Sequence, residues 1–504
     1  MILIWLMLIL FVAGIAALIA ERSNPMLPRV IALGALLLDL GLLLLVLFFP
    51  ATMGADATNQ INIGQDGEWL VLLQADWIPQ LGISFIFGAD GLSLLLIILT
   101  VFLGLMSLGA AWHEITERSG FFYLNLLWTL TGVIGVFSAL DLFLFFVFWE
   151  VMLVPMYFII AIWGHENKSY AAMKFFIFTQ VSGLLMLVAM LGLVFAHYQI
   201  SGALTFNYFA LLDTDFTTEV GFWLMLGFFI AFATKLPTVP LHNWLPDAHS
   251  QAPTAGSVIL AGILLKTGAY GLLRFALGLF PDESAAFAPV AMTLGAISIL
   301  YTAKVAFAQD DLKRLIAYTS VSHMGFVMLG IYAWNAQSAQ GAVMTMLAHG
   351  FSAAALFMVA GGLQHRLHTR DMRQMGGLWG GMPKLSFMAL FFTVAAVGMP
   401  GLGNFIGEFL VLLGSFQRSV TITVFATGGL IVAAIYSLIV IQRAFHGEPK
   451  QKYGDVADLS KMEMACYIAM MLGLVWMGLY PQSMLALAES GLMNLGLDMS
   501  TGAR

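Results

Sequence analysis

The sequence predicts an all-α integral membrane protein, and three observations support this class. Of the 504 residues, 60% are hydrophobic and only 10% are charged, whereas a soluble globular chain carries about 25% charged residues. Hydrophobic runs near the length that crosses a bilayer as a helix recur along the whole chain. No low-complexity tract or flexible linker separates them, so we expect one continuous membrane domain.

Hydropathy predicts fourteen transmembrane helices. The first run, residues 2–20, lacks a basic n-region and an A-x-A-like cleavage pattern, so we expect it to be retained as the first helix. The longest early connection, about residues 50–89, carries Asp and Gly but no Lys or Arg, and is predicted to be a loop. The predicted helices cover residues 2–20, 29–49, 90–111, 120–138, 141–162, 171–195, 219–239, 254–279, 287–308, 313–333, 340–364, 384–416, 421–445 and 461–481.

The basic residues support this count, because lysine and arginine gather in the cytoplasmic loops of membrane proteins. If both termini lie outside and the helices alternate in direction, 16 of the 21 basic residues fall on the inner side. A wrong number of helices would place the basic residues that follow the error on the opposite side and so remove this bias. The inner set includes Lys174, Lys313 and Arg314, and the outer set is Arg274, Arg418 and Arg504.

Cofactor motifs are not expected on this chain. Its single cysteine, Cys466, excludes an internal disulfide and a cysteine-held iron–sulfur cluster. The "HRLH" stretch at 365–368 has the spacing of a helical metal site but falls in a basic loop. The "GLGNFIG" stretch has no surrounding βαβ unit and is not a dinucleotide fingerprint. We therefore expect neither a metal nor a bound cofactor here.

Two segments of the chain resemble each other. "LMLGFFIAFATKLP" (224–237) and "FMALFFTVAAVGMP" (387–400) share five of fourteen positions, including the final proline. They lie in the seventh and twelfth predicted helices, and an odd separation of five helices inverts the second copy in the membrane. Paired broken helices in inverted repeats are typical of transporters, with the ion path at the breaks. Chance similarity between apolar segments is the alternative.

Four charges fall within the predicted helices: Glu150, Lys235, Lys266 and Glu408. At 1.5 Å per residue, Glu150 lies about 14 Å and Lys266 about 18 Å into a hydrocarbon core of about 30 Å. Each such charge costs about 2.5–3.5 kcal/mol on insertion scales. Structural ion pairs are one explanation. A proton relay is the one we favour, because a buried lysine beside a movable carboxylate can load and release a proton.

Prolines and histidines extend this prediction. Pro237 and Pro240 follow Lys235, and a proline frees backbone carbonyls that need protein or water partners at membrane depth. Water at such a break would complete a proton path. His323 and His349 lie within predicted helices and are candidate relay members. The two other histidines near Lys235 are expected to be mainly structural, and they are His242 and His249.

Four stretches carry a resemblance to a known family. They read "FWEVMLVPMYF", "KLPTVPLHNWLPDAHSQAPTAGSVILAGILLKTGAYGLLRF", "DLKRLIAYTSVSHMGF" and "GMPGLGNFIGEF". The sequence resembles the antiporter-like membrane subunits of respiratory complex I over almost its whole length. Within that family, the "MGLYPQ" stretch and Glu408, where related subunits often have lysine, favour one branch.

The resemblance implies a fold and a set of roles. It implies two inverted five-helix repeats, at 120–280 and 287–446, with broken seventh and twelfth helices, preceded by 1–119 and followed by 447–504. It also implies that Glu150 pairs with Lys235, that Lys266 is the central link, and that Glu408 is the distal proton site. His323 and His349 would extend the path.

The resemblance also implies partners and a location. The chain would move protons as part of NADH–quinone oxidoreductase in the bacterial inner membrane, with both termini in the periplasm. Its partners would be neighbouring antiporter-like subunits, lipid, protons and water, and no nucleic acid. NADH, FMN, iron–sulfur clusters and quinone would bind other subunits. A related cation/proton antiporter or membrane-bound hydrogenase, a self-contained solute transporter and a structural scaffold are the alternatives.

Overall fold

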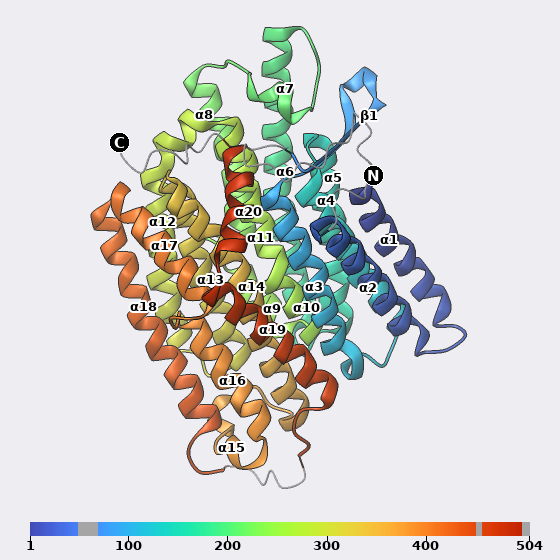
Figure 1. The fold of residues 1–504 in the computed structure, drawn as a ribbon, viewed down its shortest axis with the longest axis vertical. Helices are drawn as coiled ribbons and strands as arrows, with labels where there is room; N and C mark the ends of the chain where they lie inside the picture. Colours follow the sequence, from blue (N-terminus) through green and yellow to red (C-terminus); the bar gives the residue numbers. More distant parts are fainter. Residues whose placement is uncertain (49–68, 450–455, 496–504) are drawn as a thin grey trace.

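Long helices run side by side along the molecule in the computed structural model (Figure 1). The structure describes residues 1–48, 69–449 and 456–495. Within these residues, thirteen helical spans are long and apolar enough to cross a membrane. They are α1 (Ile2–Ala20), α2 (Leu27–Phe48), α3 (Gly91–Glu114), α4 (Ser119–Ser138), α5 (Leu142–Trp163), α6 (Lys168–Ser201), α8 (Thr218–Lys235), the run Thr254–Leu277, α12 (Pro281–Phe307), α13 (Leu312–Tyr332), α14 (Ala336–Leu367), the run Val420–Phe445 that begins with α18 (Val420–Val440), and α19 (Lys461–Leu479).

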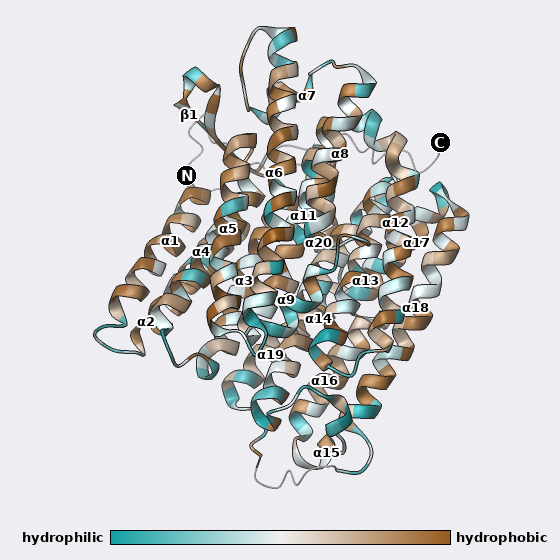
Figure 2. Cartoon of the chain, turned by 180° about the vertical axis from the view of Figure 1, so that it is seen from behind, coloured by the Kyte–Doolittle hydropathy of each residue, from teal (hydrophilic) through white to brown (hydrophobic). Residues whose placement is uncertain are grey.

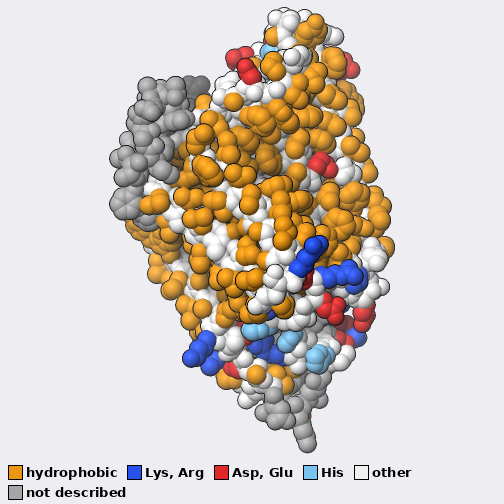
Figure 3. Space-filling model, turned by 90° about the vertical axis from the view of Figure 1, so that its right-hand side faces the viewer, with side chains coloured by type: hydrophobic (Ala, Val, Ile, Leu, Met, Phe, Trp, Pro, Cys, Tyr) orange, Lys and Arg blue, Asp and Glu red, His pale blue; other side chains and the backbone are white. Residues whose placement is uncertain are grey.

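The two ends of this helical body differ in character. Hydrophobic residues line the helices and hydrophilic residues concentrate toward the ends (Figure 2). In Figure 3, the visible lysine and arginine side chains lie in the lower half of the molecule. We call the upper end of Figure 1 the hairpin end and the lower end the basic end. The hairpin end holds β1 (Val71–Ile78), β2 (Ile83–Ala89) and α7 (Tyr208–Leu212), and the basic end holds α15 (Leu378–Gly381) and the connection around His165.

The predicted seventh helix is broken, and it ends earlier than the sequence suggested. α8 stops at Lys235 instead of residue 239, and a short helix, α9 (Trp244–Gln251), follows eight non-helical residues. Pro237 and Pro240 explain the early end, because proline cannot donate the backbone bond that continues a helix. One carbonyl near the break is satisfied by a side chain, since the Trp244 indole donates to the Thr234 oxygen at 2.9 Å.

The predicted twelfth helix is broken into two short helices, as the resemblance to the family implied. α16 (Pro383–Ala396) and α17 (Gly403–Arg418) are separated by residues 397–402. Gly398 and Gly401 have φ of 82° and 93° within this break, a conformation that residues with a side chain rarely adopt. Neither piece reaches the length of a full span, which is why the described residues contain thirteen such spans.

The predicted eighth helix crosses the centre of the molecule. It consists of α10 (Thr254–Ile259), a π-helical segment (Leu260–Leu264), α11 (Leu265–Gly271) and a second π-helical segment (Leu272–Leu277). Its residues are buried throughout. Wide π turns are uncommon and often occur at functional sites.

Two elements at the hairpin end were not predicted. The predicted loop over 50–89 includes an antiparallel pair of strands, β1 and β2; residues 50–68 lie outside the described part. A backbone bond from Leu140 to the Ile86 oxygen and a bond from the Ser84 amide to Asp141 attach the hairpin to the start of α5. A further helix, α20 (Gln482–Met493), packs against the start of α3. Hydropathy detects spanning helices, and both elements depend on tertiary contacts instead.

Candidate functional site

Four of the predicted relay residues form a row through the middle of the molecule. Lys266 on α11 donates a hydrogen bond from Nζ to Nδ1 of His349 on α14, at 2.8 Å. The ring of His349 lies 5.5 Å, between centroids, from the ring of His323 on α13. His323 Nδ1 lies 2.8 Å from Glu408 Oε1 on α17. The structure therefore brings these four side chains together from four helices.

The row is enclosed by protein. Each of its four side chains belongs to a residue that is at most 4% exposed. Lys266 also donates to the Ala261 carbonyl, at 2.6 Å, within the π-helical segment. The Nε2 atoms of His323 and His349 have no hydrogen-bond partner among the described residues. An imidazole with a free ring nitrogen can take up a proton at one nitrogen and release one from the other.

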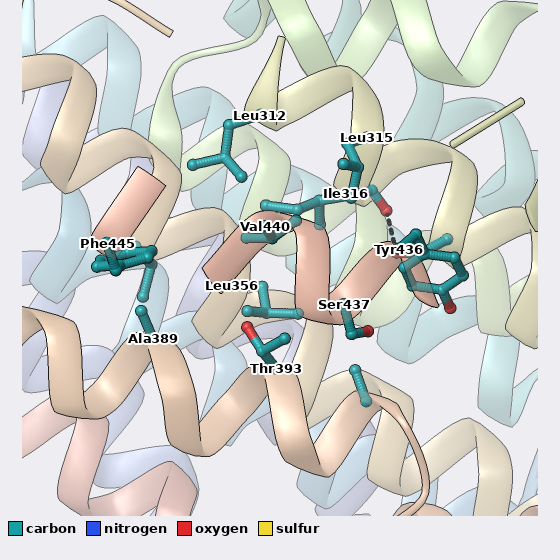
Figure 4. Close-up of a pocket in the computed structure, with 13 residues that line it drawn as sticks. Leu312, Leu315, Ile316, Leu356, Ala389, Thr393, Tyr436, Ser437, Val440 and Phe445 are labelled. Carbon is teal, nitrogen blue, oxygen red and sulfur yellow. Dashed lines mark hydrogen bonds between the residues drawn. The ribbon is translucent and has the colours of Figure 1, made fainter. Parts of the chain in front are cut away.

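Glu408 lies at the end of the row, beside the break between α16 and α17. A Cβ on Gly398 would come within 3.0 Å of Glu408 Oε2, so the glycine leaves room for the carboxylate. Tyr436 of α18 interacts electrostatically with Glu408. Figure 4 shows Tyr436 with Ser437 and Thr393 around a cavity of about 20 Å³. That volume is enough for one water molecule.

Glu150 and Lys235 form a second group with a different geometry. The Lys235 ammonium is buried, and it lies 5.4 Å from the ring centroids of both Trp149 and Phe175. Its Nζ has no hydrogen-bond partner among the described residues. Glu150 is half-buried, and it interacts electrostatically with Lys235 and bonds to Gln180. The implied Glu150–Lys235 pair is thus a coupling through space, with cation–π contacts in place of a direct ion pair.

The two groups meet where α8 packs against α11. A Cβ on Gly268 would lie 2.6 Å from the Leu236 amide nitrogen and from the Phe232 carbonyl oxygen, so the backbones are in close contact. Hydrogen bonds in the described part of the chain link Lys266 to the row but not to Lys235. The row runs from Lys266 to Glu408 through two hydrogen bonds and one pair of adjacent imidazole rings. No hydrogen bond among the described residues joins it to Lys235.

Two further buried groups lie near the row, and the sequence did not assign them to it. His249 on α9 is fully buried and stacks on Phe357 with a centroid distance of 4.4 Å. Neither of its ring nitrogens has a hydrogen-bond partner among the described residues, yet it interacts electrostatically with Lys266 and Lys313. Lys313, expected at the inner side, is also fully buried. Its position at the start of a predicted helix made it look like a topology signal.

Arg274, which the predicted topology places on the outer side, is also fully buried. It forms an ion pair with Asp90, the residue that caps α3. The Asn494 amide donates to the same carboxylate at 3.3 Å, and the Tyr270 hydroxyl accepts from Arg274 Nε at 3.4 Å. This ion pair joins the start of α3, the end of the eighth predicted helix and the end of α20.

The site contains donors and acceptors for protons and offers little to a metal. Within residues 1–48, 69–449 and 456–495, no three His, Cys, Asp or Glu side chains come together in a way that could hold a metal ion. The buried lysines Lys235, Lys266 and Lys313 donate hydrogen bonds and, as ammonium groups, do not ligate cations.

Comparisons with known proteins identify the family. A family model described as "NADH:quinone oxidoreductase/Mrp antiporter, TM" matches residues 139–434. NADH-quinone oxidoreductase subunit M of Pseudomonas aeruginosa is 54% identical over 99% of both chains. The Escherichia coli K12 protein of the same name is 53% identical over 98% of this chain and 97% of its own.

Solved structures agree in fold. A chain of respiratory complex I from Thermus thermophilus with bound NADH has a TM-score of 0.85 and 32% identity, covering 98% of this chain and all of that chain. A chain of the Mrp complex from Dietzia sp. has a TM-score of 0.84, 20% identity and coverage of 99% and 97%, and shares the fold.

The resemblance stated from the four sequence stretches is confirmed, and so is the branch that Glu408 and "MGLYPQ" favoured. These matches cover 99% and 98% of this chain. The chain therefore belongs to the antiporter-like membrane subunits of respiratory complex I, in the subunit M family of NADH-quinone oxidoreductases.

Proposed function

We propose that the chain carries protons across the bacterial inner membrane through Glu150, Lys235, Lys266, His349, His323 and Glu408, driven by electron transfer on other subunits of NADH-quinone oxidoreductase. The observation that carries this proposal is the buried row from Lys266 to Glu408. A row of side chains that each hold and release a proton is what proton transfer at membrane depth requires.

Electrostatic repulsion gives the relay its direction along the membrane. Lys235 and Lys266 are both buried and their helices are in contact. Two ammonium groups in such a medium disfavour each other. Movement of Glu150 away from Lys235 would remove the stabilising negative charge, and the resulting repulsion would shift a proton from Lys266 toward His349. Glu408 would receive it through His323.

We also infer the orientation and the repeat organisation. The basic end faces the cytoplasm and both termini lie in the periplasm, since basic loops stay on the cytoplasmic side. Residues 120–280 and 287–446 are inverted repeats, which the matching breaks after α8 and α16 support. Residues 1–119 and 447–504 flank them. Glu150, only half-buried in the isolated chain, is a natural place for contact with a neighbouring antiporter-like subunit.

The decisive experiment measures proton translocation per electron in reconstituted complex. Glu408→Gln keeps the size of the side chain and removes its ability to exchange a proton. Proton uptake at a matched rate of electron transfer should fall in this variant. Unchanged pumping by an assembled Glu408→Gln complex would remove Glu408 from the path.

A further inference from the structure

Lys313 lies between two cavities that open at the basic end. One has a volume of about 540 Å³ and is lined by His165, Asp311, Arg370 and others. The second has a volume of about 180 Å³ and is lined by Glu114, Thr254 and others. Lys313 contacts His165 Nε2 at 3.3 Å and interacts electrostatically with Glu114 and Asp311. Each cavity therefore brings ionisable groups toward the same buried ammonium.

His249 connects Lys313 with the row. It interacts electrostatically with both Lys313 and Lys266, and His349 interacts with His249. Both nitrogens of His249 lack a hydrogen-bond partner within the described residues, so neither is committed to a structural bond. A buried imidazole with two uncommitted nitrogens, within electrostatic range of two lysines, has the chemistry of a proton carrier.

The groups that hydrogen-bond to the Lys313 ammonium are neutral and do not cancel its charge. Its Nζ donates to the Ala252 carbonyl at 3.2 Å, at the end of α9. Burial, followed by the charges of Lys313, Arg370 and Lys168, lowers the pKa of His165 to about 3. His165 is therefore a neutral acceptor for the lysine. No ion pair with a carboxylate holds Lys313 in the described part of the chain, so it remains free to give up a proton.

We propose that Lys313 is the proton-carrying residue that admits protons from the two cavities at the basic end to the central row, through His249. The proton leaves Lys313 Nζ, passes through water to a ring nitrogen of His249 and continues to the Lys266–His349 pair. The neutral Lys313 amine then takes a proton from cavity water, which is replenished from the solvent at the basic end. This inference rests on the proposed function, because it supplies the entry to the same relay.

Chemical rescue tests the role directly. In the purified complex, Lys313→Ala should lower the NADH–quinone reductase rate by at least about tenfold, because loss of a proton-transferring group typically slows the transfer step by about 10²–10⁴. Millimolar methylamine should restore the rate several-fold, since the cavities can admit a small amine that replaces the missing group. Tetramethylammonium carries the same charge without a transferable proton and should not restore it. The NADH–quinone reductase rate is measured in the absence of a proton gradient. Amines can dissipate such a gradient, and this effect then cannot change the measured rate.

Matched controls separate proton transfer from structure. Arg314→Gln removes the neighbouring positive charge, whose partner Asp247 keeps its second ion pair with Lys174, and should change the rate little. Lys313 contacts His165, which lines one cavity, whereas the bonding partners of Lys266 line neither. Methylamine should therefore not rescue Lys266→Ala. If Lys313→Ala fails to assemble, Lys313→Arg decides, since arginine keeps the bond to Ala252 but does not release its proton.

Two results would overturn the proposal. The first is a wild-type rate in Lys313→Arg or Lys313→Ala, and the second is a loss in assembled Lys313→Ala that methylamine does not relieve. Either would make Lys313 a cap for the end of α9. Failure of the whole relay is distinguishable, because it would appear as normal pumping in Lys266→Ala and Glu408→Gln.

Discussion

The two charged groups of the relay solve the problem of a buried charge in different ways. Lys266 is held by a carbonyl and an imidazole, and hydrogen bonds or adjacent rings continue from it to Glu408. Lys235 has aromatic faces around it and a carboxylate that acts only through space. The difference indicates two separate roles. The group around Lys266 conducts protons, and the group around Lys235 responds to a change in a neighbouring charge.

Lys266→Ala should have the largest effect, because it removes the residue at which the row begins. His349 Nδ1 and the Ala261 carbonyl would both lose their donor. We expect the chain to assemble and pumping to fall by about 10²-fold or more, as for loss of a proton-transferring group. Proton uptake per electron in proteoliposomes is the measurement. An unchanged stoichiometry would argue against a continuous path through this helix.

Substitutions of Glu408 come next and test the far end of the row. Glu408→Gln should lose most pumping, whereas Glu408→Lys should retain part of it, because lysine can exchange a proton and glutamine cannot. Lysine inverts the charge beside His323, so recovery should be incomplete. Proton uptake is compared at a matched rate of electron transfer. Equal losses in the two variants would indicate that Glu408 acts as a fixed charge or a structural partner.

Glu150→Gln tests the through-space group. Glutamine keeps the shape and the contact with Gln180 but removes the charge that stabilises the Lys235 ammonium. The complex should assemble and lose most pumping and coupled electron transfer. Near-normal pumping in this variant would show that the relay runs without this carboxylate, and the proposal of two separate roles would fail.

Lys235→Arg should have the smallest effect of the four. Arginine keeps a positive charge that stacks well on Trp149 and Phe175 but does not release its proton. We expect assembly near the wild-type level and an impaired turnover, with Lys235→Ala worse in assembly. A wild-type rate in Lys235→Arg would mean that Lys235 supplies charge alone. That result would sharpen the comparison, since proton transfer would then begin at Lys266.

The sequence predicted the spanning helices well, because each is a hydrophobic run of the required length. It also predicted breaks near Pro237 and Pro400. The extent of the second break, between Ala396 and Gly403, could not be predicted, since glycine conformation depends on the surrounding fold. The hairpin of β1 and β2 was missed for a related reason: its strands are stabilised by contacts with residues far along the chain.

Site residues could be predicted from the sequence where a charged residue interrupts a long apolar run. Lys266 and Glu408 stand out in this way, and the structure places both in the row. Lys313 and Arg274 lie near the ends of predicted helices, where basic residues usually mark topology. Only packing of distant segments buries them. The distinction between a loop lysine and an enclosed one is therefore a tertiary property.

The helix that carries Lys266 is held by polar contacts near both ends and contains two π-helical segments. Glu114 accepts the Thr254 amide at one end, at 3.1 Å, and Asp90 holds Arg274 at the other. The two π-helical segments flank α11, the first between these anchors and the second around Arg274 itself. A π turn can pass along a helix by exchanging one backbone bond at a time. The central segment, α11, can therefore rotate about the helix axis. This rotation would change the direction of the Lys266 side chain while both ends of the helix stay in place.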